Sequence, residues 1–139
     1  MSNDVAFILD ARLDADTQHV VDLPFARVLL MNDARFPWLI LVPRIAGLRE
    51  LIDLSRSDQQ RLLDDINCAA NALRTLENPD KLNIAMLGNV VPQLHVHVIA
   101  RFANDAAWPK PVWGVGERIP YAEHELRRYV DEIAVALKL

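Results

Sequence analysis

Only one cysteine, Cys68, occurs among the 139 residues, and no apolar run is long enough to cross a bilayer. A single thiol excludes an intrachain disulfide and a cysteine zinc cage, so the sequence fits a reducing compartment. Residues 5–9 form an apolar run near the N-terminus, but it lies between Asp4 and Asp10 and is too short and too acidic for a secretory signal. We therefore expect a cytoplasmic protein with no membrane partner.

Positive charge is also scarce, since 15 Lys and Arg residues face 19 Asp and Glu residues and the net charge is −4. Proteins that bind nucleic acid by neutralising phosphates are more often basic, so no nucleic-acid partner is expected. Hydrophobic residues make up 52% of the chain and charged residues 24%, which suits a compact domain. No repeat or low-complexity tract interrupts the sequence, so we predict a single domain over residues 1–139.

Short apolar runs bounded by turn residues predict strands, and two periodic segments predict helices. The first helix is expected to begin at Ser57, with Gln60 at the capping-box position, and the second at Pro120. Arg61, Asp64, Asp65 and Arg74 lie off the apolar stripe of the first helix, and Cys68 is interpreted as a packing residue inside it. The predicted strands are residues 19–23, 25–31, 38–43, 82–87 and 93–102. This order of elements predicts an α+β fold with a largely antiparallel sheet.

The most distinctive segment is Gln93-Leu94-His95-Val96-His97. Side chains alternate across a strand, so Gln93, His95 and His97 are expected to share one face. Three interpretations fit this face. The histidines can be ordinary hydrogen-bonded residues, or they can bind one metal ion together with a distant carboxylate. Alternatively, a largely neutral imidazole can attack phosphorus while the second one stabilises the phosphoryl oxygens.

The stretch from Gly88 to Arg101, GNVVPQLHVHVIAR, resembles the signature of the histidine triad (HIT) superfamily, in which three histidines alternate with apolar residues. Asn32 at the end of one strand and Pro43 at the end of the next extend the resemblance over about residues 5–108. The resemblance implies an α+β, HIT-like fold: a mostly antiparallel sheet of about five strands packed with a central helix and a C-terminal helix. Residues 109–139, the C-terminal loop and helix, are less typical.

By this resemblance, His95 is the nucleophile, His97 is a donor to the phosphoryl group, and Gln93 stands in place of the first histidine. The other register would make His97 the nucleophile and put Ile99 at a polar position, so it is disfavoured. The implied protein is a nucleotide phosphohydrolase or nucleotidyl transferase that forms a covalent nucleotidyl-histidine intermediate. Phosphoramidates and dinucleoside polyphosphates are the implied substrates. A backbone carbonyl would fix the tautomer of His95, and no metal or other cofactor is implied.

The resemblance also implies further site residues and a homodimer. Asn32 would face the ribose and Asn89 the phosphate, although either can also be a simple turn or loop residue. Trp38 stands near the position of a histidine in many members, where its indole can line a base pocket or pack in the core. Val90 replaces a common Ser or Thr. These departures indicate a divergent branch.

Two alternatives remain beside the enzyme. One is a non-catalytic nucleotide-binding or interaction protein on the same fold, and the other is a metal-dependent enzyme that uses His95 and His97. Trp108 and Trp113 are interpreted either as packing residues of their loop or as an aromatic platform for a base. Arg101 is interpreted as a solvated strand end, with a phosphate contact as the alternative.

Overall fold

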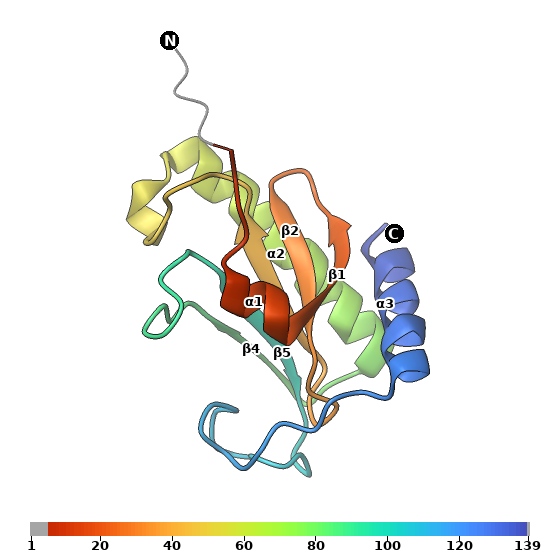
Figure 1. Ribbon diagram of the computed structural model, residues 1–139. Helices are drawn as coiled ribbons and strands as arrows, with labels where there is room; N and C mark the ends of the chain where they lie inside the picture. Colours follow the sequence, from red (N-terminus) through yellow and green to blue (C-terminus); the bar gives the residue numbers. More distant parts are fainter. Residues whose placement is uncertain (1–5, 139) are drawn as a thin grey trace.

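Five antiparallel strands form one sheet in the order β1-β2-β3-β5-β4 (Figure 1). The computed structural model describes residues 6–138. Its strands are β1 Thr17–Asp22, β2 Ala26–Met31, β3 Trp38–Pro43, β4 Lys81–Ala85 and β5 Val96–Arg101. Its helices are α1 Ala11–Asp16, the short 3₁₀ helix η1 Leu51–Asp53, α2 Arg56–Glu77 and α3 Glu123–Leu137. The predicted α+β class with a five-stranded antiparallel sheet is confirmed.

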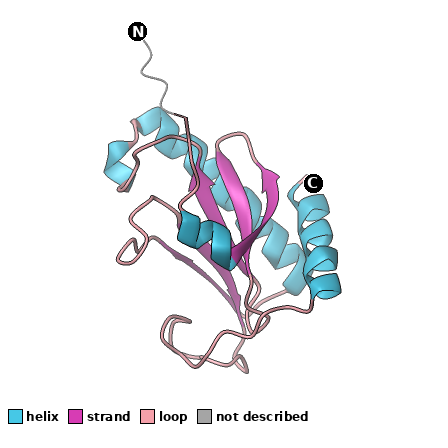
Figure 2. Ribbon diagram, in the orientation of Figure 1, coloured by secondary structure: helices cyan, strands magenta, loops and turns pink. Residues whose placement is uncertain are grey.

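The two faces of the sheet carry separate cores because side chains alternate along each strand. Leu39 and Leu41 of β3 pack with α2 and α3 on one face. Trp38 and Ile40 point to the other face, where they meet Leu13 of α1 and the loop that follows β5. Figure 1 shows α1 and α2 on opposite sides of the sheet, and Figure 2 shows the long loop between β5 and α3. None of the helices within residues 6–138 is both long and apolar enough to span a membrane.

The predicted start of α2 is wrong by two residues. Ser55, not Ser57, is the N-cap, and its Oγ accepts a hydrogen bond from the Asp58 backbone N at 3.1 Å. The helix ends at Asn78, which adopts a left-handed C-cap conformation with φ 46°. Cys68 is half-buried and donates to the Leu137 backbone oxygen at 3.3 Å, which fits the packing role predicted for it.

Asp65 was expected off the apolar stripe of this helix, but it is buried beneath the turn between β1 and β2. Its carboxylate accepts hydrogen bonds from the backbone N of Phe25 at 2.9 Å and of Ala26 at 2.7 Å. Buried carboxylates are tolerated where hydrogen bonds replace the lost water. The helix is therefore tied to the start of β2 by a polar contact that helical periodicity does not reveal.

Arg101 was interpreted as a solvated strand end, and this is also wrong because its side chain is 2% exposed. The guanidinium pairs with Asp105 at 2.8 Å and donates to the Asn83 side chain and the Lys110 backbone oxygen, each at 2.8 Å. Burial alone raises the pKa of Asp105, but the Arg101 guanidinium and the backbone N–H groups of the loop outweigh it and hold that pKa well below its ordinary value. Arg101 thus anchors the loop that crosses the sheet face.

Candidate active site

The two histidines lie where β5 enters the sheet, on the face covered by α1 and the long loop. β5 itself begins at Val96, so the predicted strand start at Gln93 is wrong. A bend at Gln93 replaces the regular alternation expected there. The rings of His95 and His97 nevertheless lie together, with centroids 4.9 Å apart in an edge-to-face arrangement. Both are buried, at 6% and 4% exposure.

His95 is oriented by the backbone of its own segment. Its Nδ1 lies 2.6 Å from the Gln93 carbonyl oxygen. A carbonyl oxygen can only accept, so Nδ1 carries the proton and Nε2 of the neutral ring keeps a lone pair. The Gln93 carbonyl is thus in the position expected of a backbone group that fixes the His95 tautomer.

His97 is held by aromatic side chains. Its ring centroid is 5.7 Å from that of Trp38 and 5.0 Å from that of Trp113. The Trp38 Nε1–H donates to His97 Nδ1 at 3.0 Å. Burial, with a smaller contribution from His95, lowers the pKa of His97 to about 3, so this imidazole is neutral at pH 7. Among the described residues, no hydrogen bond engages the Nε2 atom of either histidine.

The Gln93 side chain does not join the histidines. Its Oε1 accepts from the Asp10 backbone N at 2.8 Å, and its Nε2 donates to the Ile8 backbone oxygen at 2.9 Å. Nearby, the Arg12 guanidinium donates to the Val90 backbone oxygen at 2.7 Å. Gln93 therefore contributes its backbone carbonyl to His95 and its side chain to the N-terminal segment.

Comparisons with known proteins identify the family. The family model for the HIT domain matches residues 12–104. The chain belongs to the histidine triad family. No curated protein shows a significant match to it.

Three crystal structures of histidine triad proteins resemble the chain over nearly its whole length. The protein from Bradyrhizobium japonicum is 45% identical with a TM-score of 0.92, and the alignment covers 95% of this chain and 98% of that one. The protein from Sinorhizobium meliloti is 44% identical with a TM-score of 0.91, covering 94% and 96%. The protein from Marinobacter aquaeolei is 43% identical with a TM-score of 0.92, covering 96% and 97%. The predicted family and the HIT-like fold are confirmed.

Of the other residues predicted for the site of this histidine triad protein, Trp38 and Trp113 contact a histidine ring, that of His97. Asn32 accepts a hydrogen bond from the Tyr121 backbone N at 2.9 Å, which holds the chain ahead of α3. Asn89 is exposed in the loop between β4 and β5. Trp113 packs on His97, whereas Trp108 lies over the Arg101 guanidinium at 5.8 Å.

Two cavities flank the histidines of this HIT domain. One of 170 Å³ reaches His95 and is also lined by Arg49, Glu50 and Gly88. The other, of 280 Å³, is lined by Trp38 and Trp113 together with side chains of the long loop and the end of β2. Arg49 and Glu50 were not predicted, because the turn that brings them beside His95 leaves no periodic signal.

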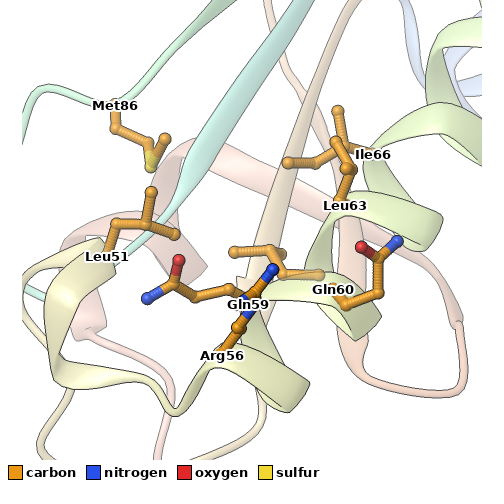
Figure 3. A pocket seen from close by; sticks show the side chains of 8 residues that line it. Leu51, Arg56, Gln59, Gln60, Leu63, Ile66 and Met86 are labelled. Atoms are coloured by element: carbon orange, nitrogen blue, oxygen red, sulfur yellow. The ribbon is translucent and has the colours of Figure 1, made fainter.

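A third cavity, of 350 Å³, lies between the start of α2 and the end of β4 (Figure 3). Its lining is mostly apolar and contains no histidine. It shares Leu51 and Met86 with the cavity at His95, so the two hollows are neighbours. Figure 3 shows Met86 facing Leu51 across this opening.

The buried neutral state of His97 makes stability depend on pH. Lowering the pH from 6.5 towards about 4.5 is expected to reduce the free energy of unfolding by about 1.4 kcal/mol per pH unit through this residue. The unfolded chain takes up a proton on His97 near pH 6.5, whereas the folded protein does so only near pH 3, so the unfolded state binds more protons in this window. Urea unfolding at a series of pH values measures the slope.

Two variants serve as controls for this experiment. His97→Gln is expected to flatten the slope, and His124→Gln, at an exposed position on α3, is expected to keep it. An unchanged slope in His97→Gln would contradict the assignment of a buried, neutral His97.

Proposed function

We propose that this histidine triad protein is a nucleotide phosphohydrolase or nucleotidyl transferase that works through a covalent nucleotidyl intermediate on His95. The observation that carries the proposal is the pairing of two imidazoles whose ring centroids lie 4.9 Å apart, of which His95 alone has its Nδ1 on a carbonyl oxygen. A lone pair on His95 Nε2 is the nucleophile that phosphoryl transfer needs. Membership of the family supports the same chemistry.

The reaction has two steps. The His95 Nε2 lone pair forms a bond to the α-phosphorus, and the bond from phosphorus to the leaving-group oxygen or nitrogen breaks. The electron pair of that bond goes to the leaving group, which takes up a proton from solvent where it leaves as an amine or an alcohol. The phosphorylated ring is cationic, and its Nδ1–H stays on the Gln93 carbonyl. Water, or an acceptor hydroxyl, then attacks phosphorus, the P–N bond breaks with its electron pair returning to Nε2, and the proton of the attacking group is released. His97 Nε2–H donates to a phosphoryl oxygen in both steps.

The surroundings of the histidines support small nucleotide substrates. The cavity lined by Trp38 and Trp113 is proposed to accept the nucleoside. The contact of Asn32 with the ribose stays a prediction from the family resemblance, because Asn32 does not line this cavity. The smaller cavity at His95 is proposed to accept the leaving group, next to the Arg49 guanidinium and the loop that carries Asn89. Adenosine phosphoramidate and dinucleoside polyphosphates are the substrates to try first.

A trapping experiment tests the proposal. The protein is mixed with adenosine phosphoramidate or a dinucleoside polyphosphate, quenched in alkaline denaturant, digested and analysed by mass spectrometry. We expect a nucleoside monophosphate on the peptide that contains His95. His19→Gln, at an exposed position on β1, is the control that should keep the label, and His95→Gln should lose it. Turnover without a label on His95 would overturn the mechanism.

The non-catalytic alternative has one observation in its favour. Gln93 occupies the first position of the triad motif, and its amide is already engaged by the N-terminal segment. A nucleotide-binding protein without turnover would bind the same ligands in calorimetry and give no label. For the metal-dependent alternative, the described residues offer no group of three or more His, Cys, Asp or Glu side chains that could hold an ion. Activity that a chelator abolishes would favour it.

The homodimer and the cytoplasmic location stay predictions. β4 is an edge strand, and Ile84, Met86 and Leu87 at or just beyond it are 49%, 42% and 48% exposed. An apolar edge strand is a surface on which a second copy can pair. Sedimentation velocity on the purified chain tests the dimer.

A further inference from the structure

Trp38 opens β3 and lies opposite Ile99 of β5, on the sheet face that carries His97. Its side chain is 6% exposed, and its ring meets Phe36 and Trp113 edge-on, with centroids 6.4 Å and 5.9 Å away. These contacts fix the direction of the indole. Its only polar atom, Nε1, points at His97 Nδ1, 3.0 Å away.

An indole N–H donates and cannot accept. His97 Nδ1 must therefore act as the acceptor, and the single proton of the neutral ring must sit on Nε2. His95 is in the opposite situation, because the Gln93 carbonyl requires the proton on Nδ1. The two histidines are thus held in opposite tautomers, because His97 Nδ1 faces a donor and His95 Nδ1 faces an acceptor.

We infer that Trp38 is a positioning residue that holds His97 in the Nε2–H tautomer, so that His97 is a permanent hydrogen-bond donor to the phosphoryl group bound at His95. The inference rests on the function proposed for this site. It gives Trp38 a role other than the base contact suggested by the sequence. Many members of the family carry an ionisable histidine near this position. The indole N–H of Trp38 instead stays a donor at every pH at which the protein folds.

The variant that isolates this role is Trp38→Phe, which keeps an aromatic ring and removes the N–H. We expect kcat to fall by about 10- to 100-fold with little change in KM, as for other groups that orient a reacting imidazole. Trp108→Phe is the matched control, because Trp108 is an indole of the same loop that lies over the Arg101 guanidinium, at 5.8 Å, and lines neither cavity beside the histidines. It should retain kcat within about threefold, since its contact is one of packing.

Nitrogen NMR of the ligand-free protein shows which nitrogen of His97 carries the proton. This would not change if Trp38 served only to pack the core. In the wild type we expect His97 with its proton on Nε2 and a scalar coupling across the hydrogen bond between Trp38 Nε1 and His97 Nδ1. Trp38→Phe should lose the coupling and let the His97 proton exchange between both nitrogens, whereas Trp108→Phe should keep the wild-type spectrum. The wild-type measurement stands by itself if Trp38→Phe does not fold.

The outcomes separate this inference from the function on which it rests. A proton on His97 Nδ1 in the wild type, or an unchanged kcat in a folded Trp38→Phe, overturns the role of Trp38. In the His97→Ala background, Trp38→Phe should cost no further activity, and a full additional loss would also overturn it. Absence of the nucleotide label on His95 together with the Nε2–H tautomer overturns the proposed function and leaves the tautomer assignment standing.

Discussion

Replacing His95 with alanine is expected to lower kcat/KM by at least about a thousandfold. In the proposed mechanism, the substitution removes the lone pair that attacks phosphorus. The fold should survive, with a loss of about 1 kcal/mol in the free energy of unfolding. His95 lies outside β5, and its polar contact is with a carbonyl two residues away. Steady-state kinetics on adenosine phosphoramidate, with urea unfolding of the same sample, measures both quantities.

His97→Ala provides the comparison. It removes a donor and keeps the nucleophile, so a smaller loss of about a hundredfold is expected and the label on His95 should still form. His95→Gly adds a second check, because free imidazole can enter the cavity left beside Gly88 and restore part of the activity. A label on His97 in His95→Ala would show that the other register of the motif is right.

Replacing Arg101 with methionine is expected to lower the free energy of unfolding by about 3–5 kcal/mol. The substitution keeps most of the buried volume but leaves the Asp105 carboxylate buried without its counter-charge. Asn83 and the Lys110 carbonyl lose a donor as well. Urea unfolding at pH 7 measures the change. Arg127→Met is the control, since its pair with Glu123 on α3 is exposed and should cost less than about 1 kcal/mol.

The same substitution should also reach the active site. Arg101 and Asp105 hold the start of the loop from which Trp113 packs on His97. Arg101→Met is therefore expected to broaden the Trp113 indole signal in NMR spectra. A stability loss as small as that of Arg127→Met would show that the buried pair is not the anchor of this loop.

The local pattern of apolar residues correctly predicted the elements that are buried along a whole run or along one stripe. Both bounds of β3 were predicted correctly. All six of its residues are buried, so each position favours an apolar residue and the whole strand is visible as an apolar run. The apolar stripe of Leu62, Ile66, Ala69, Leu73 and Leu76 predicted α2, and all of these except Leu76 are buried. The His95 and His97 pair was found because two imidazoles on an otherwise apolar strand have few structural uses.

The rest depends on partners far away in the sequence. Asp65 is buried because Phe25 and Ala26 offer it two N–H groups from 39 and 40 residues away. Gln93 turns away from the histidines because the backbone at Ile8 and Asp10, more than 80 residues distant, accepts and donates to its amide. No local periodicity carries such information, so these roles became visible only in the fold.

The amide of Gln93 contacts the N-terminal segment in the way a neighbouring β-strand would. It presents one C=O and one N–H to residues two apart, Asp10 and Ile8, which is the exchange that a peptide group makes in a sheet. An imidazole cannot reproduce this pair of bonds, because its donor and acceptor nitrogens point away from each other, whereas the amide oxygen and nitrogen lie side by side. At the position where the triad motif has its first histidine, this chain therefore has a structural residue. Gln93 acts like one residue of an added strand and ties the N-terminal segment to the candidate active site.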